Sequence, residues 1–274
     1  MRLYLQIFEI LLPFFYFSTI WVYAKIFFRS NKLAERLAPY FLYATLLSHA
    51  CYIIIRTLEY SHPPITTIFE ILSLIAFAVI FSYSYIEIRT RSKMTGYFIL
   101  MLPFFFQTIS SIFIKELTVI PPILRSYLLG FHVTSALLGY AAITISGVYG
   151  FLYLMLYHDI KSSHFSVIYK RLPNLEILEG MSFTATVLGF ILLTIAIIVG
   201  LIWMPQAVEK FSYADPKLIG TIAIWIVYAI GLAAKKIIGW QGRRIMVLSL
   251  IGFAVTMFSM TIINMFFSGF HKFY

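Results

Sequence analysis

The histidines are the residues of this chain with the clearest capacity for chemistry, because an imidazole nitrogen binds metals and moves protons near neutral pH. Three of the six histidines, His62, His132 and His271, fall at or near the ends of long apolar runs, as does the acidic residue Asp215. The single cysteine, Cys51, excludes a disulfide framework, a CxxC pair and a thiolate metal cluster. No Gly-x-Ser-x-Gly, His-Glu-x-x-His or P-loop spacing is present. Imidazole chemistry is therefore the chemistry to test.

His132 and His271 form the most informative pair. His132 lies roughly 9 Å into an apolar helix, and His271 follows the last apolar run in Ser-Gly-Phe-His-Lys-Phe-Tyr. If these helices pack together, two neutral imidazoles meet at one depth, which suits the axial positions of a haem iron. Zinc ranks second, because it needs three or four ligands and His62 is the remaining candidate. The simpler alternatives are a hydrogen bond from His132 to a neighbouring helix and an interfacial tail around His271.

Other polar residues fall in the first third of the chain. His49 and Arg56 lie seven residues apart on one helix face. The pair either provides a guide for a propionate or a second ligand site, or makes a polar contact between helices, which we favour. The His62-Pro-Pro loop leads into a helix start at which Glu70 either lines a site or caps the helix. Glu9 is a lone carboxylate that can pair with any of these bases.

The elements that position these residues are membrane-spanning helices. The chain has 274 residues, of which 61% are hydrophobic and only 12% charged, whereas about a quarter of a soluble domain is charged. The length is filled by about eight spans of roughly 20 residues, so we expect an all-α, polytopic integral membrane protein that forms a single transmembrane helical domain over 1–274. The expected spans are 3–24, 38–57, 68–86, 97–114, 126–157, 181–203, 218–237 and 245–268.

The distribution of basic residues predicts the topology. The loops after the first, third, fifth and seventh spans hold 14 of the 21 Lys and Arg residues, and the positive-inside rule places these loops in the cytoplasm. Both termini then lie on the non-cytoplasmic side, together with His62, His132, His271 and the loop that carries Asp215. The net charge of +10 is scattered through short loops, so it indicates orientation in the lipid bilayer and no nucleic-acid partner.

Three segments resemble one family. Phe131 to Ala142 reads Phe-His-Val-Thr-Ser-Ala-Leu-Leu-Gly-Tyr-Ala-Ala; Asp215-Pro-Lys is followed by Trp225, Tyr228 and Gly-Trp-Gln-Gly-Arg-Arg at 239–244; and Asn264 leads to Ser-Gly-Phe-His at 268–271. The order and spacing resemble the cytochrome c assembly membrane proteins, which include the CcsA/ResC haem-handling subunits and the shorter HemX-like proteins. The resemblance covers roughly 45–274.

The resemblance implies a multi-pass protein of the cytoplasmic (inner) membrane that holds haem b at an external site for delivery to apocytochrome c. His132 and His271 would be the axial iron ligands, and Asp215, Tyr213 and Phe211 would shape the cavity. Arg56 and His62 are the further candidates for contact with the cofactor, as noted above. A ResB/CcsB-like membrane subunit is the implied partner, and any enzymatic role would be as part of a cytochrome c haem lyase complex.

Two departures from the family pattern favour the HemX-like branch. The loop before Asp215 reads Glu-Lys-Phe-Ser-Tyr-Ala and lacks the expected tryptophans. Ala233 occupies the place where the full exporters carry a membrane-embedded histidine. The alternative function is therefore a membrane accessory or regulator of haem biosynthesis that acts through a protein partner. A solute transporter ranks last, because we find no inverted repeat.

Overall fold

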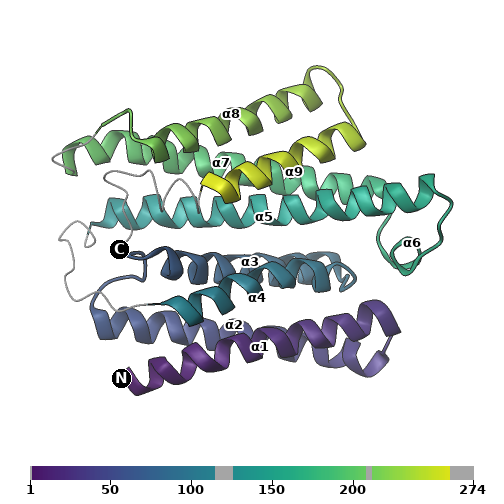
Figure 1. Cartoon of the computed structure of the whole chain (residues 1–274), viewed down its shortest axis with the longest axis horizontal. Coiled ribbons are helices and arrows are strands. Elements are labelled where there is room, and N and C mark those ends of the chain that lie inside the picture. Colours follow the sequence, from purple (N-terminus) through teal and green to yellow (C-terminus); the bar gives the residue numbers. More distant parts are fainter. Residues whose placement is uncertain (1, 115–125, 208–211, 260–274) are drawn as a thin grey trace. The chain divides into compact units, whose positions relative to one another are not determined.

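The computed structural model describes residues 2–114, 126–207 and 212–259, and within these ranges the regular structure is entirely helical (Figure 1). Seven of the described helices are long and apolar enough to cross a membrane, which confirms the prediction of an all-α, polytopic membrane protein. The helices group into two compact units, Met1–Val119 and Ile120–Tyr274. The expected single domain, the count of eight spans and the side of the termini remain predictions.

Unit 1 contains the helices α1 (Arg2–Arg29), α2 (Lys32–Tyr60), α3 (Ile68–Thr90) and α4 (Gly96–Phe113). Helix α1 packs against α2 and α4, and α3 packs against α2 and α4. Large apolar side chains such as Phe14 and Leu47 are exposed, whereas the polar side chains of Thr45, His49 and Gln107 are completely buried. This distribution is the one that a bilayer favours, because lipid accepts the apolar surface and leaves polar groups to bond one another.

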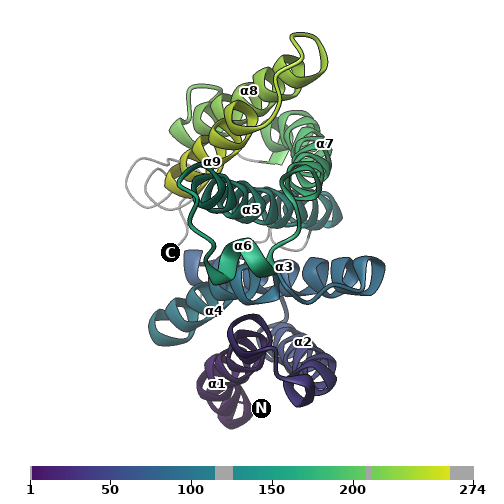
Figure 2. The same cartoon turned by 90° about the vertical axis from the view of Figure 1, so that its right-hand side faces the viewer.

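Unit 2 contains α5 (Tyr127–Lys161), the short α6 (Val167–Arg171), α7 (Leu175–Ala207), α8 (Pro216–Lys236) and α9 (Arg243–Phe258). Helix α5 makes its most extensive contact with α7 and a second one with α9, while α8 packs against α7 and α9 (Figure 2). A Cβ atom on Gly189 of α7 would lie 3.2 Å from the carbonyl oxygen of Gly139 on α5. Gly139 and Gly189 therefore allow α5 and α7 to pack closely, as small residues do between membrane helices.

Most helices extend beyond the apolar runs that predicted them. The run at 181–203 lies inside the longer α7, and the run at 38–57 lies inside α2. The reason is that polar residues at a membrane interface still make intrahelical hydrogen bonds, which hydropathy does not register. The predicted span at 245–268 begins within α9, and its part after residue 259 lies outside the described residues.

Candidate functional site

His132 is held by a neighbouring helix of unit 2. It lies in the second turn of α5, and its Nδ1 atom is 2.8 Å from the carbonyl oxygen of Ala196 on α7. A carbonyl oxygen only accepts hydrogen bonds, so Nδ1 carries the proton and donates. In a neutral imidazole the lone pair is then on Nε2, the nitrogen that is able to bind a metal.

The ring of His132 also rests against a glycine. A Cβ atom built on Gly200 of α7 would lie 2.9 Å from the Cε1 atom of His132 and 3.1 Å from its Nδ1 atom. Both distances are shorter than an ordinary van der Waals contact, so the ring occupies the space that a side chain at position 200 would take. The hydrogen bond from His132 to a neighbouring helix, which we gave as the simpler alternative, is therefore present and involves Nδ1. It leaves Nε2 for a ligand.

Asp215 lies at the start of α8, in unit 2. Asp215 is buried and acts as the N-cap of α8, with Oδ1 accepting a hydrogen bond of 2.9 Å from the amide of Lys217. Tyr213, in the turn that precedes Asp215, is exposed. Of the residues predicted to shape the cavity, Asp215 is therefore buried and Tyr213 is exposed.

Two predicted site residues, Phe211 and His271, lie outside the described residues. Among the residues that the structure does describe, no group of three or more His, Cys, Asp or Glu side chains lies close enough to hold a metal ion. Of the two predicted iron ligands, the described part of the chain therefore contains only His132.

The segment from Asp215 to Arg244 holds α8 and α9 to the rest of unit 2. The indole Nε1 of Trp225 donates a hydrogen bond of 2.8 Å to the hydroxyl of Thr194 on α7. Glu179 of α7 accepts a hydrogen bond of 2.9 Å from the amide of Gly242 and pairs with Lys235. Gly242 has a φ of 63°, a conformation that favours glycine. These contacts therefore fix α8, the helix that Asp215 caps.

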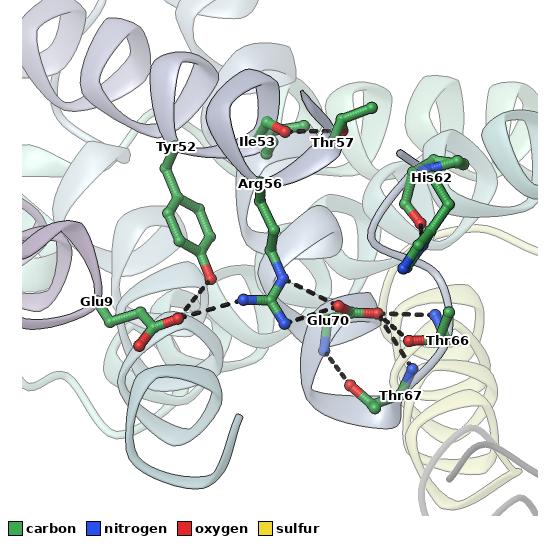
Figure 3. A network of polar contacts seen from close by, with 10 residues as sticks. Glu9, Tyr52, Ile53, Arg56, Thr57, His62, Thr66, Thr67 and Glu70 are labelled. Atoms are coloured by element: carbon green, nitrogen blue, oxygen red, sulfur yellow. Dashed lines mark hydrogen bonds and ion pairs between the residues drawn. The ribbon is translucent and has the colours of Figure 1, made fainter. Parts of the chain in front are cut away.

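Unit 1 contains a buried charged network around Arg56 (Figure 3). The Nε and Nη2 atoms of Arg56 each lie 2.9 Å from Oε1 of Glu70, and Nη1 lies 3.3 Å from Oε1 of Glu9. The side chains of Arg56 and Glu70 are only 3% and 2% exposed. Glu9, predicted to pair with an unspecified base, therefore pairs with Arg56, and the polar contact between helices that we favoured for Arg56 is present.

Glu70 also organises the start of α3. Its Oε2 atom accepts hydrogen bonds from the amide and hydroxyl of Thr66 at 2.8 and 2.6 Å, while the Thr67 hydroxyl accepts from the Glu70 amide. Thr67 and Glu70 form a complete capping box. The capping role expected for Glu70 is confirmed, and the same carboxylate neutralises Arg56.

His62 lies in the loop before this cap and is buried. Its Nδ1 atom is 2.7 Å from the carbonyl oxygen of Pro63, so Nδ1 donates and Nε2 carries the lone pair, as in His132. Figure 3 shows His62 close to the Thr66 side of the network. A role for His62 in cofactor binding remains a prediction.

His49 has both nitrogens occupied. The hydroxyl of Ser73 donates to Gln107 at 2.8 Å, so Ser73 accepts from Nε2 of His49 at 3.0 Å. Nδ1 then accepts from the hydroxyl of Tyr16 at 2.9 Å. This chain of bonds joins all four helices of unit 1 and confirms the interpretation of His49 as a polar contact between helices.

Sequence reasoning missed several of these partners. Ala196 contributes a backbone carbonyl, which no side-chain pattern reveals, and Gly200 contributes only the absence of a Cβ atom. Ser73 and Gln107 are polar residues within apolar runs, and such positions indicate polar contacts between helices.

Comparisons with known proteins point to one family. The model of the family described as cytochrome C assembly protein matches residues 45–271. A cytochrome c biogenesis protein CcsA of Guillardia theta is 27% identical over 237 residues, covering 80% of this chain and 79% of the relative. A protein HemX of Brevibacillus brevis is 26% identical over 228 residues, covering 80% and 81%. A CcsA protein of Mesostigma viride is 25% identical over 257 residues, covering 85% and 82%.

Proposed function

This chain belongs to the cytochrome c assembly protein family, and from that premise we propose that it handles haem in cytochrome c biogenesis, with His132 as an iron ligand. The observation that carries the proposal is the fixed orientation of His132. Its Nδ1–H donates to the Ala196 carbonyl, so the lone pair of Nε2 is available to iron. A ligand imidazole that is oriented through its second nitrogen is typical of metal and haem sites.

The proposed cofactor is haem b, and the proposed second axial ligand is His271. Asp215 would act indirectly, because as the N-cap of α8 it fixes the turn that contains Tyr213. Phe211 and Tyr213 would supply the ring faces that cover the porphyrin. The haem would supply the group that is attached to apocytochrome c, while the protein binds it, orients it and limits its contact with water.

The proposed location is the external face of the cytoplasmic membrane, with a ResB/CcsB-like subunit as the partner. The basic residues of the predicted cytoplasmic loops support this orientation. Export of haem through this chain is not part of the proposal, because Ala233 has no side chain that binds iron.

Arg56 and His62 of unit 1 are further proposed cofactor contacts. Arg56 already pairs with Glu70 and Glu9, so a haem propionate would have to share or displace the contact with Glu9. His62 presents Nε2 as His132 does, and this observation supports its candidacy.

A second candidate function is a membrane accessory that regulates haem biosynthesis through a protein partner. The absence of tryptophan from the loop at 209–214 favours it, and one similar protein carries the name HemX. The two functions differ in the effect of gene deletion. Loss of holocytochrome c with normal haem precursors supports delivery to apocytochrome c, whereas normal cytochrome c with altered precursors supports the regulatory function.

The direct test of the ligand assignment is the absorption spectrum of the purified protein reconstituted with haem b. We expect the spectrum of a six-coordinate, bis-histidine haem, and we expect the His132→Ala and His271→Ala variants to lose it. An unchanged spectrum in the His132→Ala variant would remove His132 from the site.

A further inference from the structure

We propose that helix α7 positions His132 for iron binding through two backbone features, the carbonyl of Ala196 and the bare Cα of Gly200. The inference rests on the proposed function, since it concerns the same ligand. Gly200 is a positioning residue in this proposal, because it acts on the iron only through the imidazole.

The two features lie on one face of α7. Ala196 and Gly200 are four residues apart, which places them one above the other on a helix. The Cα–Cβ bond in a helix tilts toward the N-terminus, so a side chain at position 200 would point back over the carbonyl of Ala196. A carbonyl oxygen has two lone pairs and is able to accept the imidazole N–H in addition to a helical hydrogen bond. Gly200 therefore leaves this carbonyl open to His132.

The contact distances agree with this geometry. The Nδ1 atom of His132 is 2.8 Å from the Ala196 oxygen, and a Cβ atom on Gly200 would approach the same Nδ1 to 3.1 Å and Cε1 to 2.9 Å. An ordinary contact needs at least 3.4 Å, so the ring would have to move by about half an ångström if position 200 were alanine. A movement of this size misaligns the hydrogen bond that determines the tautomer.

The hydrogen bond from Nδ1 of His132 determines which nitrogen of the ring faces the iron. While Nδ1 donates to Ala196, His132 is held as the tautomer whose lone pair is on Nε2. Without that bond the imidazole is free to exchange tautomers and to rotate, so only a fraction of the molecules present Nε2 correctly. Removing the group that orients a metal-binding histidine typically weakens metal affinity about 10- to 100-fold.

The experiment compares Gly200→Ala with Gly180→Ala in the full-length protein. Gly180 lies on the same helix, and a Cβ atom there would meet nothing within 4 Å, so the control makes the same chemical change without the clash. Two quantities are measured in detergent: the dissociation constant for haem b, and the ¹⁵N spectrum of histidine-labelled protein without haem, with the His132 signals assigned through His132→Ala. We expect Gly200→Ala to weaken haem binding about 10- to 100-fold and to mix the tautomers of His132. Gly180→Ala should match the wild type in every measurement.

The possible failures are distinguishable. If His132→Ala abolishes the haem spectrum while Gly200→Ala keeps both the wild-type affinity and the wild-type tautomer, the positioning role is wrong and the ligand assignment stands. If His132→Ala leaves the haem spectrum unchanged, the proposed ligand and its positioning toward iron both fail. Should Gly200→Ala not fold, the ¹⁵N spectrum of the wild type still decides, because a protonated Nε2 on His132 would overturn the inference.

Discussion

Replacing Glu70 with glutamine tests how the charged network of unit 1 is balanced. The substitution keeps a hydrogen-bonding side chain at the third position of α3, so the capping box with Thr67 is retained. It removes the negative charge that both the Nε and the Nη2 atoms of Arg56 contact at 2.9 Å. The variant therefore isolates the ion pair from the helix cap.

The expected loss follows from the burial of the pair. Removing one partner of a buried ion pair costs about 3–5 kcal/mol, because the other charge stays buried without compensation. Arg56 keeps Glu9 as a partner at 3.3 Å, so we expect the lower end, about 3 kcal/mol in the free energy of unfolding. Thr67→Ala, which removes the cap and keeps the charge, should cost about 1 kcal/mol.

The assay is reversible unfolding by sodium dodecyl sulfate in mixed micelles, followed by circular dichroism. The triple variant with Glu9→Gln, Arg56→Met and Glu70→Gln removes all three charges of the network, and we expect it to recover most of the stability lost in Glu70→Gln. If Glu70→Gln costs no more than Thr67→Ala, the explanation of Glu70 as the buried counter-ion of Arg56 is refuted.

Three further predictions concern other helix contacts. His49→Gln should leave the spectrum of bound haem unchanged, because Tyr16 and Ser73 already occupy both nitrogens of His49; a changed iron ligation would contradict the network. Asp215→Asn should unfold like the wild type and Asp215→Ala should lose about 1 kcal/mol in the same detergent titration, because asparagine also caps helices; an Asp215→Ala variant as stable as the wild type would show that the cap is unimportant. Ser146 of α5 bonds Thr186 of α7 at 2.7 Å and Ser249 of α9 at 2.9 Å, so Ser146→Ala should destabilise unit 2 by about 1–2 kcal/mol, and an unchanged unfolding midpoint would argue against this cluster.

The fold was predictable because lipid imposes few solutions. Long apolar runs without alternation have to be helices, and the predicted runs at 3–24 and 68–86 lie within α1 and α3. The grouping of the helices into two units was not predictable, since hydropathy reports contact with lipid and contains no information on which helices pack together.

Only the side chains of the candidate site, and not the backbone groups that orient them, were predictable from the sequence. The position of His132 within an apolar run and the resemblance to one family made it a candidate, and capping was one of the two roles predicted for Glu70 from its place after a His-Pro-Pro loop. The groups that orient His132 belong to the backbone of α7, and a backbone carbonyl at Ala196 has no signature in the sequence. The pairing of Arg56 with Glu70 depends on the packing of α2 against α3, which spacing along the chain does not determine.

The absorption spectrum of the haem-loaded protein, compared with that of the His132→Ala variant, tests the central claim most directly. We expect a low-spin, bis-histidine spectrum in the wild type and its loss in the variant, with recovery when imidazole is added. A variant that binds haem b with the wild-type spectrum and affinity would contradict it.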